Sequence, residues 1–318
     1  MEELEVIPTE FEQAPVLLLA VIVLYKSTVQ CSASFRTLQS AIRRMPPEKL
    51  RVRILLYDNT VGGECQGTLP KGVNYESSSS NHGLADAYNR ALELAEQEGF
   101  HWLLTLDQDT ALPETFLENL CNAIVRVEAS PEISAVVPQI LEKGRMLSPN
   151  YFLLSAVPRF FHLGFVGIPT QATFAFNSAS TLRVSDLREI GGYSPLFWLD
   201  YCDAYIFNRL NRNGKKVFIA GNIQVEHEFS MLDVKKRVTL ERYRNIVQAG
   251  CAFWDMELGT LAGLYHTASL VYRLYKHWKR GDDPAIRRIT LKMLKKRLLQ
   301  SRKRRIEDWK RAQESMYV

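Results

Sequence analysis

Three apolar runs that alternate with helical patterns constrain the fold of this chain more than any other feature. The runs VLLLAVIVLYKST at 16–28, VRILLYDNT at 52–60 and HWLLTLD at 101–107 are rich in strand-favouring residues. Between them, residues 34–45 and 83–99 space their apolar side chains as amphipathic helices do, and the sequence PETFLENLCNAIVRV predicts a further helix opened by its proline. Strands that alternate with helices predict an α/β fold with a Rossmann-like, mostly parallel central sheet flanked by helices.

Length and composition are those of a globular protein with a full core. At 318 residues and 46% hydrophobic content, the chain can form one large domain or a domain with an appendage. Its five cysteines include no CxxC pair, so neither a disulfide framework nor a thiolate zinc site is indicated. Residues 1–14 are acidic, and the apolar run after them is about half as long as a bilayer span. We therefore expect no signal peptide, no transmembrane helix and a reducing, cytoplasmic location.

Charge is segregated along the chain, although the net charge is only +5. Residues 272–318 carry 16 Lys and Arg against 5 Asp and Glu, which leaves residues 1–271 with a balance of −6. Residues 255–318 are expected to form two or three amphipathic helices. Such a basic segment predicts peripheral contact with an anionic surface such as the inner face of the plasma membrane, while a homodimer contact or a solvated face stays open. No recognisable nucleic-acid-binding module is present, so nucleic acid is not the expected partner.

Polar side chains follow each strand-like run where the run ends. They are Tyr25, Asp58, Asn59, Asp107, Gln108 and Asp109. Ligands of parallel α/β sheets collect outside the carboxyl ends of the strands, so we expect these side chains to line one crevice. Carboxylates one residue apart, such as Asp107 and Asp109, can both reach one divalent cation. The alternative is that Asp109 caps the following helix and Asp107 is merely exposed.

Six motifs in sequence order resemble those of inverting family-2 glycosyltransferases with the GT-A fold, most closely the rhamnosyltransferase-like branch. They are VIVLYKST, LLYDNT, NHGLADAYNRAL, LLTLDQDT, FNSASTLRVSDLREIGGYSPLFWLDYCDAYIFNRLNRNGKK and VEHEFS. The similarity covers residues 15–250. It implies a nucleotide-binding half at 15–110, an acceptor half at 111–250 and a basic helical C-terminal extension at 251–318.

The resemblance assigns contacts with a nucleotide-sugar donor to the first half. It implies that Asp58 contacts the nucleobase, with Tyr25 and Asn59 nearby. The residues of NHGLADAYNRAL that match the nucleotide-lining segment are Asn81, Gly83 and Asn89. A helix cap at Asn81 and a tight loop at Gly83 are compatible with that role.

The same resemblance implies a site for Mn²⁺ or Mg²⁺. Asp109 matches the firmer metal ligand of the family's DxD motif, and Asp107 is shared between metal and donor. Gln108 between them is typical of the rhamnosyltransferase-like branch. His227 matches a frequent third ligand, although a lone histidine is more often a structural residue.

Carboxylates of the second half match the family's acceptor side. Asp203 falls on the position of the general base, which must start ionised, and Asp200 on an acid often found three residues earlier. Their alternative role is to begin a helix. Arg242 and Arg244 match basic residues near the diphosphate or acceptor. The chain departs from the family at Tyr205 and Ile206, where an acid and an aromatic residue are usual, so acceptor contacts there are in doubt.

The activity implied by the resemblance is transfer of L-rhamnose from dTDP-rhamnose to a saccharide or lipid-linked saccharide in cell-surface polysaccharide synthesis, such as that of O-antigen. UDP-galactofuranose and UDP-hexoses are alternative donors. A phosphatase of the haloacid dehalogenase type would need DxDx[TV] after the first strand, whereas the fifth position here is Ala111 after the third. A non-enzymatic Ca²⁺ or nucleic-acid module is the other class, but DQDTALPETFLE lacks the ligands of an EF-hand.

Overall fold

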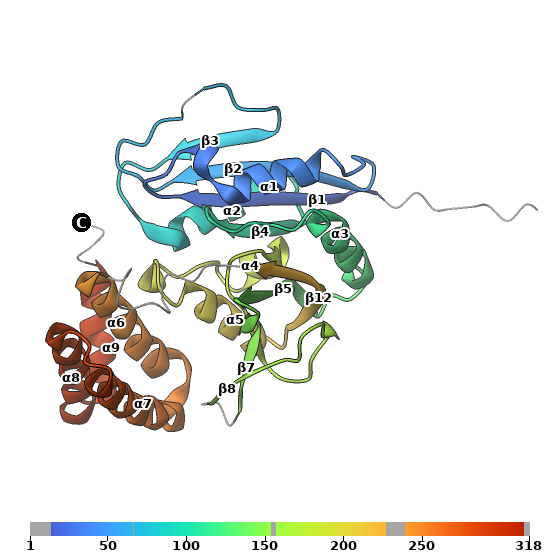
Figure 1. The fold of residues 1–318 in the computed structure, drawn as a ribbon. Helices are drawn as coiled ribbons and strands as arrows, with labels where there is room; N and C mark the ends of the chain where they lie inside the picture. Colours follow the sequence, from blue (N-terminus) through green and yellow to red (C-terminus); the bar gives the residue numbers. More distant parts are fainter. Residues whose placement is uncertain (1–13, 66, 154–156, 227–238, 315–318) are drawn as a thin grey trace, which may run out of the picture.

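A mixed, mostly parallel β-sheet runs through the protein (Figure 1), whose computed structural model describes residues 14–65, 67–153, 157–226 and 239–314. In spatial order its strands are β3 (Val73–Ser77), β2 (Leu50–Asp58), β1 (Val16–Leu24), β4 (Trp102–Asp107), β11 (Ser180–Arg183), β5 (Ile133–Glu142), β12 (Lys216–Glu226) and β9 (Val166–Gly167), and β6 (Arg145–Ser148) pairs with β5. A smaller sheet contains β10 (Thr173–Phe174), β7 (Asn150–Leu153) and β8 (Val157–Phe160). The expected α/β fold is confirmed.

Strand β1 is apolar throughout because both of its faces are buried. Leu18, Ala20 and Ile22 join the core beneath α1 (Ala33–Ile42) and α3 (Phe116–Val127). Leu19 and Val21 join the opposite core, against α2 (Gly83–Gln97), α4 (Val184–Glu189) and α5 (Cys202–Arg212). A central strand with helices on both sides loses the apolar–polar alternation of a half-exposed strand, which explains the continuous runs in the sequence.

One antiparallel strand interrupts the parallel order of the sheet. Strands β3, β2, β1 and β4 are mutually parallel, as are β5 and β12. Strand β11 lies antiparallel between β4 and β5 and joins the two parallel parts into one sheet. Through β11, the turn that precedes this strand comes to lie beside the end of β4, where the paired acids are.

The C-terminal helices form a bundle beside the sheet (Figure 1). They are α6 (Leu240–Glu257), α7 (Gly259–Lys279), α8 (Pro284–Leu299) and α9 (Arg302–Glu314). The predicted division at residue 250 falls inside α6, because that helix packs on both parts. Phe197, in the 3₁₀ turn η2 (Pro195–Phe197), lies against the rings of Phe253 and Trp309 at centroid distances of 5.9 and 6.4 Å. Within the described ranges, no helix is long and apolar enough to cross a membrane.

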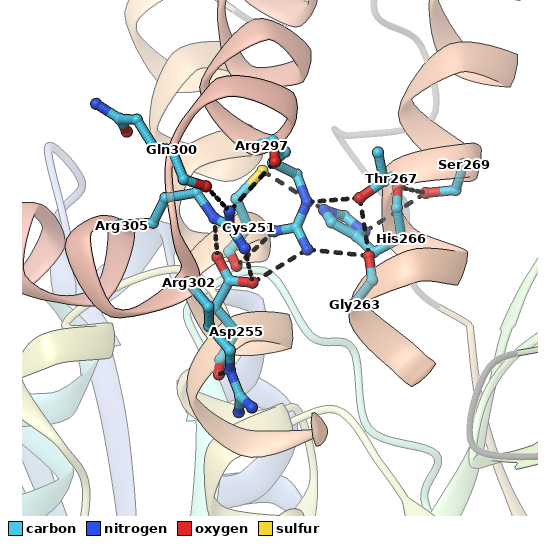
Figure 2. Close-up of polar contacts among 10 residues, drawn as sticks. All are labelled: Cys251, Asp255, Gly263, His266, Thr267, Ser269, Arg297, Gln300, Arg302 and Arg305. Carbon is cyan, nitrogen blue, oxygen red and sulfur yellow. Dashed lines mark hydrogen bonds and ion pairs between the residues drawn. The ribbon is translucent and has the colours of Figure 1, made fainter. Parts of the chain in front are cut away.

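A buried ion network holds the bundle together (Figure 2). Asp255 of α6 accepts two hydrogen bonds from Arg305 of α9, at 2.8 and 2.9 Å, and pairs with Arg297 of α8 at 3.1 Å. Arg297 also donates to the Gly263 carbonyl and to the Thr267 hydroxyl of α7, each at 3.0 Å. The Asp255 carboxylate, through Arg297 and Arg305, thus links α6, α7, α8 and α9. Some of the positive charge in the C-terminal sequence is therefore paired inside the protein.

Candidate active site

The carboxyl ends of β2, β1 and β4 are level, which brings the loops that follow them to one edge of the sheet. In the parallel register, Asp58 lies opposite Leu24 and Asp107 lies opposite Val23. The polar residues after these strands therefore belong to one edge, where ligands of such sheets bind. Their side chains divide into exposed groups and groups that tie the loops together.

Asp58 lies in a pocket at the ends of β1 and β2. The pocket has a volume of about 380 Å³ and is also lined by Lys26, Thr60, Glu64 and Tyr75. Asp58 is buried and accepts hydrogen bonds from the Tyr75 hydroxyl at 2.7 Å and from the Thr60 backbone N–H at 2.8 Å. Burial and this carboxylate raise the pKa of Tyr75, so Tyr75 stays protonated at neutral pH and donates to Asp58. Tyr75 was not anticipated, because it lies on the short, half-exposed strand β3.

Gln108 ties the loop after β4 to the loop after β1. Its Oε1 accepts from the Tyr25 backbone N–H at 2.9 Å, and its Nε2 donates to the Tyr25 carbonyl at 3.3 Å. Both ends of the amide are bonded to the Tyr25 backbone, so Gln108 positions this loop, and its contact with the donor stays a prediction. The Tyr25 ring is 43% exposed and can meet a ligand.

Asn59, Asn81 and Gly83 form the junction between β2 and α2. The Asn59 side-chain amide donates to the Gly83 carbonyl at 2.8 Å. Asn81 Oδ1 accepts from the Gly83 backbone N–H at 3.0 Å, at the first residue of α2. The helix-starting role of Asn81 is therefore present in the structure, and contact of these residues with a nucleotide stays a prediction.

Gly83 also meets the acceptor half directly. Its φ is +78°, and a Cβ atom there would lie 2.3 Å from Cε3 and 2.4 Å from the carbonyl oxygen of Trp198. The Trp198 carbonyl accepts a 3.0 Å hydrogen bond from Ala85 at the start of α2. The nucleotide-binding half and the residues before the acids at 200 and 203 are thus in contact through a glycine.

Gly83→Ala is expected to destabilise the protein by about 1–3 kcal/mol more than Gly99→Ala, because overpacking is added to backbone strain. Gly99 is a matched control, since its φ is +71° and a Cβ there would meet nothing within 4 Å. Urea unfolding followed by circular dichroism measures the difference. Equal destabilisation by the two variants would contradict the close contact with Trp198.

Asn89 holds the acceptor half rather than facing the edge of the sheet. Its Nδ2 donates to the Tyr193 carbonyl and its Oδ1 accepts from the Tyr193 backbone N–H, both at 2.8 Å. Both ends of the amide are thus occupied by the Tyr193 backbone, and contact of Asn89 with a nucleotide stays a prediction. The pairing spans 104 residues of sequence, which no local pattern reveals.

The paired acids occupy different surroundings at the end of β4. The Asp107 carboxylate accepts a hydrogen bond from the buried Ser178 hydroxyl in the turn before β11. Asp109 is exposed and, in the described part of the chain, has no hydrogen bond or ion pair. It does not cap α3, which begins at Phe116 with Thr115 at its N-cap. The predicted helix start at the proline was wrong, because Phe116 donates to the Pro113 carbonyl in a preceding turn.

The chemistry of these carboxylates fits a hard divalent cation. Carboxylate oxygens are preferred ligands of Mg²⁺ and Mn²⁺, and Asp109 offers an exposed carboxylate with no protein partner among the described residues. Those residues include no group of three or more His, Cys, Asp or Glu that could hold a metal. The expected third ligand, His227, lies outside the described residues.

Asp200 and Asp203 precede or begin α5 and lie in a low-dielectric environment. Burial raises the pKa of Asp203 to about 6, and the Asp107 and Asp200 carboxylates raise it as well, whereas the 2.7 Å hydrogen bond from Ala204 N–H lowers it. Because the Asp107 and Asp203 carboxylates interact electrostatically, the end of β4 and the first turn of α5 belong to one site. Asp203 also lies in the first turn of α5, as the helix-starting alternative predicts, and its role as a general base stays a prediction.

Arg242 of α6 pairs with one of these acids. Its Nη2 lies 2.9 Å from Asp200 Oδ1, and the Asp200 side chain is only 8% exposed. Burial raises the pKa of Asp200 to about 6, although the Arg242 charge lowers it. Arg242 therefore links α6 to Asp200 in this structure. Arg244 on the same helix is exposed. Contact of either arginine with a diphosphate stays a prediction.

A second cavity lies beside the contact between η2 and the C-terminal bundle. It has a volume of about 170 Å³ and is lined by Asp200, Trp198 and Phe197 on one side and by Trp309 and Gln313 of α9 on the other. Trp309 Nε1 and Gln313 Oε1 are buried without a hydrogen-bond partner among the described residues. The predicted acceptor half thus ends at a partly polar cavity whose far wall comes from the bundle.

Comparisons with known proteins agree with this architecture. The model of "Glycosyl transferase family 2" matches residues 36–191, whereas no curated protein sequence matches. GalNAc-T7, solved with UDP, GalNAc and Mn²⁺, superposes with a TM-score of 0.54 at 15% identity, covering 92% of this chain and 56% of its own. A mannosyltransferase from Pyrobaculum calidifontis, solved with GDP-Man and Mn²⁺, superposes with a TM-score of 0.54 at 12% identity. The match covers 94% of this chain and 91% of the mannosyltransferase.

The structural likeness concerns the fold alone, because both identities are low, and the chain spans little more than half of GalNAc-T7. The family model covers both the end of β2 with Asp58 and the acids at the end of β4. The rhamnosyltransferase-like branch is not distinguished by these comparisons. Residues 36–191 of the chain match glycosyl transferase family 2, and the chain has the GT-A fold of these structures.

Proposed function

We propose that the protein is an inverting, metal-dependent glycosyltransferase that moves L-rhamnose from dTDP-rhamnose to a saccharide or lipid-linked saccharide acceptor at the cytoplasmic side of the membrane. The observation that carries the proposal is the half-buried Asp203 carboxylate, which interacts electrostatically with Asp107 at the end of β4. A carboxylate with a pKa near 6 is mostly ionised at neutral pH and is still basic enough to accept a proton from a hydroxyl.

The chain's own residues supply the acid–base and positioning parts of the reaction. Asp203 accepts the proton of the acceptor hydroxyl while the hydroxyl oxygen forms a bond to the anomeric carbon. The bond from that carbon to the diphosphate breaks on the opposite face, so one displacement inverts the centre and needs no nucleophilic side chain. Asp58 and Tyr75, with the Tyr25 ring at the same edge, offer polar and aromatic groups for the nucleobase.

Asp109 and Asp107, with His227 as a further proposed ligand, would hold Mn²⁺ or Mg²⁺. The structures similar to this one were solved with Mn²⁺, which supports a divalent cation here. When bound, the cation would offset the negative charge that develops on the leaving diphosphate. Among the chain's residues, Gln108 then serves to fix the Tyr25 loop beside this site.

A donor panel tests the proposal and includes dTDP-rhamnose, UDP-galactofuranose and UDP-hexoses, each with Mn²⁺ or Mg²⁺. Release of nucleoside diphosphate from one donor is expected, with a rate at least about 100-fold lower for Asp109→Asn, because a charged ligand is lost. Glu307→Gln, at an exposed acid of α9, is the control and should match wild type. No turnover with any donor, or release of inorganic phosphate from phosphomonoesters instead, would contradict a glycosyltransferase.

A further inference from the structure

Helix α7 carries an exposed apolar stripe along its whole length. Large side chains on one face of the helix are left in solvent at spacings of three and four residues, and they are Leu261, Leu264, Tyr265, Val271, Tyr272, Tyr275 and Trp278. The opposite face, with Ala262, His266, Leu270 and His277, is buried. The stripe is therefore the outer face of a helix whose inner face is already packed. Trp254 lies beside its Tyr265 ring at a centroid distance of 5.9 Å, and the other side chains of the stripe are more than half exposed.

The charge around the stripe is almost entirely positive. Helix α7 contains no Asp or Glu, and residues 259–299 hold ten Lys and Arg against only Asp282 and Asp283. Asp282 is buried against His277 at 2.7 Å, and Asp283 caps α8 through a 2.7 Å hydrogen bond from Ala285. Neither acid offsets the exposed cations by pairing with one of them.

Aromatic residues and cations alternate toward the C-terminal end of α7. The Lys276 ammonium lies 4.6 Å from the centroid of the Tyr272 ring, and Trp278 is followed by Lys279 and Arg280. Tyrosine and tryptophan favour the boundary between lipid headgroups and acyl chains, and nearby lysines extend their ammonium groups to anionic headgroups. Helix α8, packed beside α7, adds exposed Leu291, Leu298 and Leu299 among further lysines.

We infer that the outer face of α7, from Leu261 to Trp278, docks the protein on the surface of an anionic phospholipid bilayer. A bilayer matches both the apolar stripe and its positive charge, whereas a second copy of this chain would bring like charges together. The helix lies on the bilayer and does not enter as a span, in keeping with its polar buried face. This surface begins before the basic segment 272–318 named from the sequence and does not require α9, whose Arg305 is buried against Asp255.

The inference deepens the proposed function by placing the enzyme where a lipid-linked acceptor would lie. The binding itself needs neither donor nor acceptor, so it is tested separately from catalysis. Vesicles of phosphatidylglycerol and phosphatidylcholine are the probe, and vesicles of phosphatidylcholine alone are the comparison. The full-length chain is expected to sediment with the anionic vesicles and to be released by high salt, because its cations are screened.

The double variant Tyr275→Ser with Trp278→Ser is expected to lower the vesicle partition coefficient at least about tenfold, since two exposed aromatic rings no longer enter the interface. The matched control, Phe160→Ser with Leu163→Ser, removes comparably exposed apolar side chains from β8 and the following loop and should bind as wild type does. Circular dichroism checks that both variants fold.

Two outcomes would overturn the inference. One is that wild type fails to bind anionic vesicles, or that the α7 variant binds as strongly as the control. The other is that wild type is a dimer in the absence of lipid and the α7 variant is a monomer, which would identify a second copy as the occupant. Release of nucleoside diphosphate with a soluble acceptor, measured on the same samples, reports the proposed activity independently of either outcome.

Discussion

Asp203→Asn is expected to lower kcat by about two to four orders of magnitude, the usual contribution of a general base, while donor binding changes little. The amide keeps a similar shape and can still accept the hydrogen bond from Ala204, but it cannot take a proton. Nucleoside diphosphate release under saturating donor measures kcat, and isothermal titration with the donor measures binding. A variant that keeps more than a tenth of wild-type kcat would rule out Asp203 as the base.

Wild type and Asp203→Asn are expected to differ in the pH dependence of both kcat and the free energy of unfolding. The proposed base is the ionised form of Asp203, whose pKa is raised to about 6, so wild-type kcat should fall as the pH drops below about 6. The free energy of unfolding should change in the opposite direction, falling as the pH rises. As the pH rises from about 4 to 6, the unfolded chain ionises first, so the folded wild type loses stability that the Asn variant keeps. Urea unfolding at several pH values measures this, and the variant should be at least as stable as wild type at neutral pH.

Asp255→Ala is expected to destabilise the protein by about 3–5 kcal/mol, because it leaves buried arginine charge without its carboxylate. Arg297 is 7% exposed, and both Arg297 and Arg305 pair with Asp255 (Figure 2). The measurement is the free energy of unfolding in urea. Asp308→Ala is the control, since Asp308 pairs with Arg311 nearer the surface, where such pairs contribute at most about 1 kcal/mol.

If Asp255→Ala lowered the free energy of unfolding no more than Asp308→Ala does, the buried ion network would not stabilise the bundle. The same network makes deletion of 281–318 a poor test of membrane contact, because the deletion removes both arginines and leaves Asp255 buried alone. Substitutions on the exposed face of α7 avoid that difficulty, since none of the substituted side chains belongs to the network.

The central strands could be predicted because their environment imposes a pattern. Strand β1 is buried on both faces and β4 along most of its length, so each is a continuous apolar run. Strand β3 is a half-exposed edge strand of VNYES, and β11 contains only STLR, so neither has a distinctive pattern. The absence of β3 from the prediction hid Tyr75, and the contact of Ser178 with Asp107 depends on the antiparallel insertion of β11, which brings the recognised motif FNSAS beside β4.

Positions of the site residues could be predicted better than their contacts. Asp58 and Asp107 lie at strand ends that the sequence marks, and the resemblance located Asp203. Gln108 and Asn89 have backbone partners 83 and 104 residues away, and such pairs depend on the assembled fold. Asp255 is similar, since its arginine partner Arg305 lies 50 residues further along. A charged residue in a basic C-terminal segment gives no sign that it will be buried.

Tyr201 connects the C-terminal bundle directly to the segment that carries Asp200 and Asp203. This residue stands between the two acids with φ at +66°, and its ring lies so close to Gly250 of α6 that a Cβ there would be 2.7 Å from the Tyr201 hydroxyl. The C-terminal bundle therefore supports the backbone from which the proposed base projects. A chain cut before α6 would retain Asp58, Asp107 and Asp109, yet it would lose the surface against which the acceptor-side acids are aligned.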